Sequence, residues 1–307
     1  MPNREIIQGL HQIQDEVKVL REEIRSLKED KAQKYSELRG MLRRRGLDLY
    51  RENPIDHLLF PAHFTEKAKE QFYVLFKRYS FRLFLREILN RQGIFRVAEV
   101  VRFSSTDTGY KYLHSLIDLG LVESAASRGY RLRYLPSASL GPTLEWFMSE
   151  VLRREFFCAA LYGMRFKGTP SGGDYDVIAD LEGRLVYMEV KSSPPKNIEG
   201  DEVHEFLGRL QDLIPNLALF FVDTELRLKD KIIPMFEAER FALPEPESGA
   251  LLPIQKIADE IYFVPSRIYV LGSKRSIVQN LALCFRHHFI HSSIHSPDNG
   301  ISGQRSN

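Results

Sequence analysis

Two short apolar runs separated by a tight turn constrain the fold of this chain more than any other feature. The runs are Tyr175–Asp180 and Arg184–Ser192, and the turn is Leu181–Gly183. Runs of this length, bounded by turn residues, predict two neighbouring strands of a sheet. Because side chains alternate between the faces of a strand, Glu189 and Lys191 point the same way, one pleat apart. A carboxylate and an ammonium on an otherwise apolar strand are costly unless they pair or bind something.

The residues around this pair favour phosphodiester hydrolysis. Asp176 lies near the start of the first strand, and pairing of the two strands as a hairpin brings its carboxylate towards Glu189. Carboxylates are suitable ligands for Mg²⁺, which also keeps waters and substrate phosphate in its shell. A bound metal polarises the phosphate and lowers the pKa of a bound water, while a lysine orients that water or neutralises the developing charge. We therefore expect Asp176 and Glu189 to hold Mg²⁺ (or Mn²⁺) and Lys191 to act beside it.

This stretch resembles the active-site region of the PD-(D/E)XK nuclease superfamily, which includes restriction-type endonucleases and Holliday-junction resolvases. The family pattern is an Asp, a spacer, and then Glu-X-Lys in the next strand. Here Asp176 precedes Glu189-Val190-Lys191 by thirteen residues, and the resemblance covers roughly 140–225. It implies a metal-dependent DNA endonuclease with a mixed α/β sheet flanked by helices. The alternative is a non-catalytic DNA-binding or regulatory protein that keeps the scaffold, with Glu189 and Lys191 as a buried ion pair.

Two positions depart from a simple match to the family. Tyr175 stands where the family often has Pro, and Asp174 lies two residues before Asp176 with the same strand parity. Asp174 is therefore an alternative ligand. We favour Asp176 because Val177–Ala179 continue directly from it as a buried strand.

The family also places a carboxylate on the first helix of the domain, expected here over Thr143–Leu161. Glu145, Glu150 and Glu155 are the candidates. On a helical wheel Glu145 lies at the edge of the apolar stripe, whereas Glu150 lies on the opposite, solvated face with Trp146. Glu155 falls on the stripe but near the helix end. We expect Glu145 to complete the site, because a helix residue that reaches it must lie near the core side.

The rest of this nuclease-like domain, expected over residues 139–291, is also predicted as α/β. The helix expected over Asp201–Leu213 carries three polar residues, His204, Arg209 and Gln211. They either touch substrate or, more typically, face solvent. The further elements of the domain follow the helix that carries these residues: a strand over Leu217–Val222, a strand over Ile261–Val270 and a helix over Lys274–Ile290. Residues 292–307 are polar and are predicted to form a disordered tail.

Residues 65–138 are predicted to form a basic helical module. Its expected elements are a long helix, Thr65–Gln92, a short helix near Val97–Val101, a helix capped by Ser104 and Ser105, and a hairpin. This order resembles a winged helix, in which the third helix enters the major groove. Residues 65–135 hold 13 Lys and Arg against 7 Asp and Glu, which favours nucleic acid over protein as the partner. The expected DNA contacts are Lys111, Tyr112, Arg128, Arg131 and Arg133.

The first 38 residues carry a heptad pattern, and residues 39–64 are expected to be a connector. The apolar positions step by four and three residues; they are Ile6, Leu10, Ile13, Val17, Leu20, Ile24 and Leu27. β-branched residues at the first core position with Leu at the second favour a parallel dimer, so we expect a homodimeric coiled coil. The alternative is a helix packed on its own chain.

Cysteine use and hydropathy set the expected location. Cys158 and Cys284 both lie in apolar stretches, which fits reduced thiols in an intracellular protein. No uninterrupted apolar run is long enough to span a bilayer, so no membrane partner is expected. We expect a cytoplasmic protein, nucleoid-associated if prokaryotic.

Overall fold

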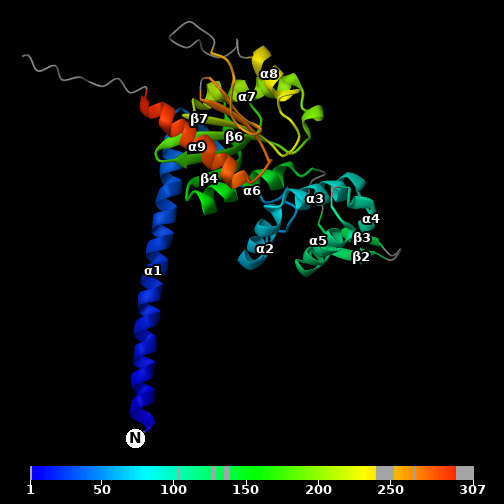
Figure 1. Cartoon of the computed structure of the whole chain (residues 1–307). Coiled ribbons are helices and arrows are strands. Elements are labelled where there is room, and N and C mark those ends of the chain that lie inside the picture. The colour runs from blue at the N-terminus through cyan, green and yellow to red at the C-terminus, as the bar shows by residue number, and fades with distance from the viewer. Residues whose placement is uncertain are drawn as a thin grey trace, which may run out of the picture.

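The computed structural model describes residues 2–102, 104–125, 129–134, 139–239, 252–265 and 267–294. Within these ranges a large mixed sheet carries helices on both faces, and a helical module with a small hairpin lies beside it (Figure 1). The N-terminal helix α1 (Pro2–Arg44) extends away from the body like a rod (Figure 1). No helix in the described part of the chain is both long and apolar enough to cross a membrane.

The main sheet has eight strands in the order β1-β4-β5-β6-β7-β10-β9-β8. Neighbours from β1 to β6 pair antiparallel, β6, β7 and β10 run parallel, and β9 and β8 return to antiparallel pairing. The strands are β1 (Asp48–Arg51), β4 (Ala159–Lys167), β5 (Tyr175–Leu181), β6 (Arg184–Lys191), β7 (Leu217–Val222), β8 (Gln255–Ala258), β9 (Ile261–Val264) and β10 (Ile268–Gly272).

Helices cover both faces of this sheet, which makes three layers (Figure 1). Along β6, Val186 and Met188 join the core beneath one helical layer, and Leu185 and Tyr187 join the core beneath the other. The alternation expected from the sequence is therefore confirmed, as is the mixed α/β class. One layer contains α6 (Gly141–Glu155) and α9 (Ile277–Ile294); the other contains the end of α1, α7 (Gly200–Leu213) and α8 (Ile232–Glu239).

The segment expected to be a connector belongs in part to the sheet domain. Leu38 and Leu42, on the last turns of α1, are buried in the sheet core, and β1 forms an edge strand beside β4. Phe60 then packs edge-on against Trp146 of α6, with ring centroids 4.9 Å apart. Trp146 is consequently buried, and the solvated face expected for this helix is wrong at that position.

Two further boundaries differ from the prediction for local reasons. Helix α6 ends at Glu155, six residues before the expected end, because Phe157 takes a left-handed backbone conformation (φ 55°) and the chain turns into β4. The single strand expected over Ile261–Val270 is the pair β9 and β10, since Arg267 is also left-handed (φ 71°) and reverses the chain.

In the basic module the long helix expected over Thr65–Gln92 is broken at Arg78. The Arg82 guanidinium donates to the carbonyl oxygens of Phe76 and Lys77, which a continuous helix would have bonded itself. The later order of helices and hairpin agrees with the prediction. The module comprises α2 (Glu66–Phe76), α3 (Tyr79–Arg91), α4 (Val97–Val100), α5 (Thr106–Asp118), β2 (Val122–Ala125) and β3 (Gly129–Leu132).

The heptad seam of α1 is open along its described length. Its side chains are between 40% and 67% exposed, so the seam does not pack on the chain's own body. The side chains of Ile6 and Leu10 lie outside the described residues. The exposed seam positions are Ile13, Val17, Leu20, Ile24 and Leu27.

Candidate active site

The paired strands β5 and β6 bring Asp176 and Glu189 opposite each other. Val177 of β5 faces Met188 of β6 in the antiparallel register, so the next pair outward is Asp176 with Glu189. The Asp176 carboxylate accepts a hydrogen bond of 2.7 Å from the Val190 backbone N–H. This contact anchors the carboxylate against the strand that carries Glu189 and Lys191.

Glu189 is the most enclosed of the predicted site residues, with 2% of its surface exposed. The Arg209 Nη1 atom of α7 donates to both of its carboxylate oxygens at 2.9 Å, and the Lys191 ammonium lies 3.0 Å away. The Tyr187 hydroxyl donates to the same carboxylate. Two cations and a phenol therefore converge on one carboxylate.

Arg209 is a site residue that the sequence left open between substrate contact and surface. Glu202, Phe206, Arg209 and Leu213 follow one another at steps of four, three and four, which places them on one stripe of α7. Phe206 and Leu213 are fully buried, so the stripe faces the sheet. The spacing of Arg209 from these apolar neighbours was the signal for its inward position.

Lys191 bridges β6 and α7. Its ammonium lies 3.0 Å from Glu189 and 2.7 Å from Glu202. Burial lowers the pKa of Lys191, but the two carboxylates outweigh burial, and the pKa is raised above its ordinary value. The lysine is therefore held charged and fixed between two elements.

The surroundings of Asp176 carry more negative than positive charge. Burial raises the pKa of its carboxyl well above the ordinary value, and the neighbouring Glu189 and Glu145 carboxylates raise it further. The Val190 N–H and the Lys191 ammonium act in the opposite direction but do not offset this. Among the described residues no cationic side chain lies within ion-pair distance of Asp176.

Glu145, the expected helix carboxylate, lies close enough to Glu189 to act on it electrostatically. Burial, followed by the charges of Asp174 and Glu189, raises the pKa of Glu145 to about 8. Gly163 of β4 makes room for this arrangement: a Cβ there would lie 3.6 Å from Glu145 Oε2 and only 2.8 Å from the Pro54 ring. Its left-handed backbone (φ 56°) also favours glycine.

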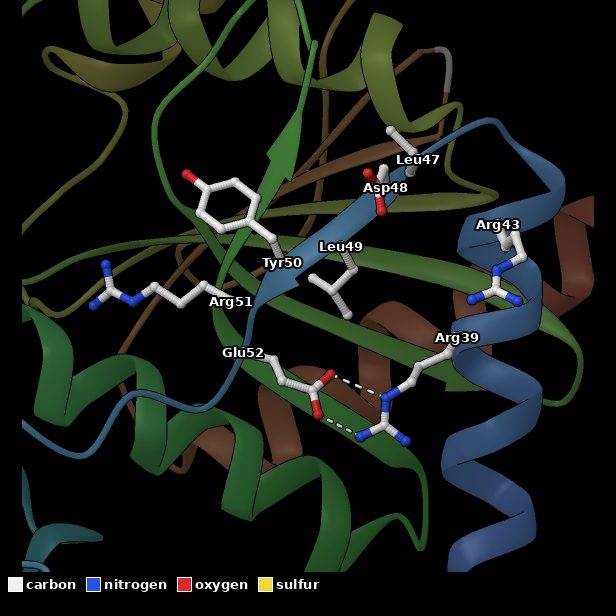
Figure 2. Close-up of a pocket in the computed structure, with 8 residues that line it drawn as sticks. All are labelled: Arg39, Arg43, Leu47, Asp48, Leu49, Tyr50, Arg51 and Glu52. Carbon is white, nitrogen blue, oxygen red and sulfur yellow. Dashed lines mark hydrogen bonds and ion pairs between the residues drawn. The ribbon is translucent and has the colours of Figure 1, made fainter.

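Asp174, the alternative ligand, is engaged elsewhere. It pairs with Arg165 and lies 4.0 Å from Arg51 of the edge strand. Figure 2 shows Arg51 on the side of β1 away from α1, whereas Glu52 turns towards α1 and pairs with Arg39. Two arginines thus compensate Asp174, which leaves Asp176 as the carboxylate beside Glu189.

The other acidic candidates on α6 do not join this cluster. Glu150 binds Arg153 and Arg154, and Glu155 accepts from the Tyr73 hydroxyl at 2.9 Å. On α7, His204 pairs with Glu239, and the Gln211 side chain is exposed.

The donor chemistry of Asp176, Glu189 and Glu145 fits a hard divalent cation. Among the described residues no three His, Cys, Asp or Glu side chains converge as a ready ligand set. Mg²⁺ commonly takes only one or two carboxylates and completes its shell with waters and phosphate oxygens. Asp176 and Glu189 suffice for such a site, provided that Glu189 frees an oxygen from Arg209 or Lys191.

The predicted DNA contacts of the basic module divide into three groups. Lys111 is exposed on α5, whereas Tyr112 is buried and its hydroxyl lies 2.7 Å from that of Ser80, so Tyr112 is a core residue and the expectation of a DNA contact is corrected. Arg131 and Arg133 are more than half exposed and share Glu123 as their partner. Arg128 lies outside the described residues.

No family model matches the sequence, and no curated protein aligns with it. The solved structures with some similarity to this chain include two proteins. Protein VC1899 from Vibrio cholerae is 12% identical with a TM-score of 0.44, over 75% of this chain and 57% of that one. Can2 from Sulfobacillus thermosulfidooxidans, solved in complex with cyclic tetra-adenylate, is 11% identical with a TM-score of 0.43, over 73% and 56%. This chain thus spans little more than half of either protein.

Proposed function

We propose that this chain is a metal-dependent DNA endonuclease of the PD-(D/E)XK type. The observation that carries the proposal is the placement of Asp176 opposite Glu189, with Lys191 beside Glu189 and Glu145 acting on both carboxylates. Mg²⁺ or Mn²⁺ held by Asp176 and Glu189 would polarise the scissile phosphate and supply a nucleophilic water.

The chain's own residues have distinct tasks in this scheme. Lys191, fixed by Glu202 on its far side, presents a positive charge for the attacking water or the phosphoryl oxygens. Arg209 holds Glu189 in place and neutralises it until the metal and substrate arrive. Glu145 acts as an outer carboxylate that orients water at the edge of the site.

The partners follow from the two N-terminal parts of the chain. DNA binds the winged-helix-like module through exposed basic residues, of which Lys111, Arg131 and Arg133 are the described members. A second copy of the chain covers the open heptad seam of α1. A dimer presents two catalytic centres, which suits cleavage of both strands.

One observation favours a second candidate, a non-catalytic DNA-binding protein. Arg209 already supplies both Glu189 oxygens with a positive charge, as a metal would. In a scaffold that has lost catalysis, this pair replaces the metal permanently. Arg209→Gln separates the two functions: it impairs a scaffold by leaving buried Glu189 with Lys191 as its one remaining cation among the described residues, whereas an enzyme retains metal binding by Asp176 and Glu189.

The test is a cleavage assay on a panel of labelled DNAs that includes duplex, branched and single-stranded substrates. Each is incubated with Mg²⁺, with Mn²⁺ or with EDTA, beside the Asp176→Asn variant. We expect cleavage that needs the metal and that Asp176→Asn abolishes. Binding without metal-dependent cleavage of any substrate would establish the scaffold instead.

A further inference from the structure

A cavity of about 1170 Å³ lies between the basic module and the sheet. One wall is α3, with Tyr79 and Leu83, and the other is formed by the segments that follow β6 and β7, with Ser193 and Leu226. In Figure 1, α3 lies at the boundary between the two parts of the molecule. Pockets for drug-sized ligands have roughly 300–1,000 Å³, so this cavity has room for a segment of a longer chain.

The walls combine cations and apolar surface. Lys196 and Arg102 are exposed there; the Lys196 ammonium makes no ion pair within the described residues, and Arg102 is 65% exposed beside Glu87 at 3.2 Å. Arg86 is held by Asp223. Glu87 and Glu225 also line the cavity. Because Arg86 pairs with Asp223 and Arg102 with Glu87, Lys196 is the lining cation without an ion-pair partner in the described part of the chain.

The apolar part of the lining includes the ring of Tyr79 beside several aliphatic side chains. Tyr79 is partly exposed, Leu226 is 61% exposed, and Pro194 lies between the two serines and Lys196. Base stacking on aromatic rings contributes to binding of single strands by about 1–3 kcal/mol per base. Paired bases are already stacked within a duplex, so only an unpaired strand can use such a surface together with the cations.

The cavity is connected to the strand that carries the candidate site. Ser192 and Ser193 immediately follow Lys191, and the Asp223 N–H donates to the Lys191 carbonyl at 2.8 Å. Thr224, the next residue, lines the cavity. An occupant therefore lies beside the end of β6 and against α3 at once.

We propose that this cavity binds unpaired nucleotides of a DNA strand, with Lys196 and Arg102 on phosphates and Tyr79 against a base. The inference rests on the proposed function, because it takes DNA as the substrate and adds that the substrate has a single-stranded part. A flap, gap or branched junction has such a part, whereas an intact duplex does not.

The experiment measures binding without cleavage. The fluorescence anisotropy of a short labelled oligothymidylate and of a blunt duplex is titrated in EDTA with the full chain, the Arg102→Ala/Lys196→Ala variant and a Lys67→Ala/Lys229→Ala control. The control removes two exposed lysines that are not among the residues lining the cavity. We expect the cavity variant to lose tenfold or more in affinity for the oligothymidylate only. The slope of the logarithm of the binding constant against the logarithm of the salt concentration should become shallower by about 1.4. Each of the two lost single-strand phosphate contacts contributes about 0.7 to this slope.

The outcomes keep this inference apart from the nuclease proposal. Selective loss of oligothymidylate binding supports the cavity even if no substrate is cleaved. Unchanged affinity, or an equal loss for oligothymidylate and duplex, overturns it even if the chain is a nuclease. Competition by free thymidine monophosphate at the same affinity as the oligothymidylate also overturns it, because the cavity would then take a small nucleotide.

Discussion

Single residues in the candidate site are arranged around an imbalance of charge. Lys191 and Arg209 bind Glu189 directly, but Asp176 and Glu145 have no ion-pair partner within the described residues. Unpaired carboxylates in a buried site disfavour the folded state, and sites that bind cations often store such strain. A divalent cation bound by these carboxylates would therefore relieve the charge imbalance.

Removing the Asp176 charge should stabilise the metal-free protein. The folded-state pKa of Asp176 is raised above its unfolded value, so the ionised carboxylate opposes folding at neutral pH. As the pH falls and the carboxylate takes up a proton, the free energy of unfolding should increase. We expect Asp176→Asn to raise the free energy of unfolding by about 1 kcal/mol at pH 7.5 and to lack the stabilisation by Mg²⁺ that we expect for wild type.

Urea unfolding with and without Mg²⁺ measures both effects. Asp180→Asn is the matched control, because Asp180 lies on the same strand and its side chain accepts a turn hydrogen bond from the Gly183 N–H, with no ion pair among the described residues. Equal Mg²⁺ stabilisation of wild type and Asp176→Asn would count against Asp176 as a ligand.

The sequence was informative for the site where local periodicity decides the outcome. Alternation along β6 placed Glu189 and Lys191 on one face, and the edge of a helical stripe singled out Glu145. Arg209 and Tyr112 were less predictable, because a charged helix residue usually faces solvent and an aromatic one can face either way. Tertiary contacts decided both: Arg209 donates to Glu189, and the hydroxyls of Tyr112 and Ser80 share a hydrogen bond.

At the scale of elements, one buried network joins the basic module to the sheet. Asp223, directly after β7, accepts from Arg82 at 2.8 Å, from Arg86 at 2.9 Å and from the Ser273 hydroxyl at 2.6 Å. The same Arg82 terminates α2. Local propensity could not predict that break, because Arg82 is held in place by Asp223, a residue 141 positions away in sequence. The edge strand β1 was missed for a similar reason, since only pairing with β4 makes it a strand.

Arg82→Leu should destabilise the chain strongly, because it leaves Asp223 buried with less compensation. Breaking a buried pair costs about 3–5 kcal/mol, whereas Arg78→Leu, at the exposed end of α2, should cost far less. Burial raises the pKa of Asp223, but Arg82 outweighs burial and the net pKa is lowered. The contribution is therefore complete above the unfolded value of about 3.9 and is lost as the pH falls below it.

Urea titrations at neutral pH and near pH 3 check this prediction. The difference in the free energy of unfolding between wild type and Arg82→Leu should be smaller near pH 3 than at neutral pH. A difference that does not change with pH would mean that lost packing, and not the Asp223 charge, accounts for the destabilisation.

At the scale of the whole molecule, the open seam of α1 predicts a dimer. Leu20 lies on the seam and Val19 does not, yet each is 54% exposed. Leu20→Glu should therefore dissociate the dimer while Val19→Glu does not, since charge in the core of a coiled coil opposes pairing. Light scattering after size exclusion should give twice 35.6 kDa for wild type and Val19→Glu, and 35.6 kDa for Leu20→Glu. Equal molar masses for the two variants would show that the seam is not the dimer interface.

In the proposed mechanism, Lys191 serves catalysis beside a metal held by Asp176 and Glu189. Single-turnover cleavage of DNA with saturating Mg²⁺ compares wild type, Lys191→Ala and an exposed-lysine control, Lys229→Ala. We expect Lys191→Ala to cleave about 10²–10³ times more slowly, with its DNA affinity and folded circular dichroism retained, because one positioned charge is lost. Lys229→Ala should cleave at the wild-type rate. A folded Lys191→Ala variant that cleaves as fast as wild type would contradict the account.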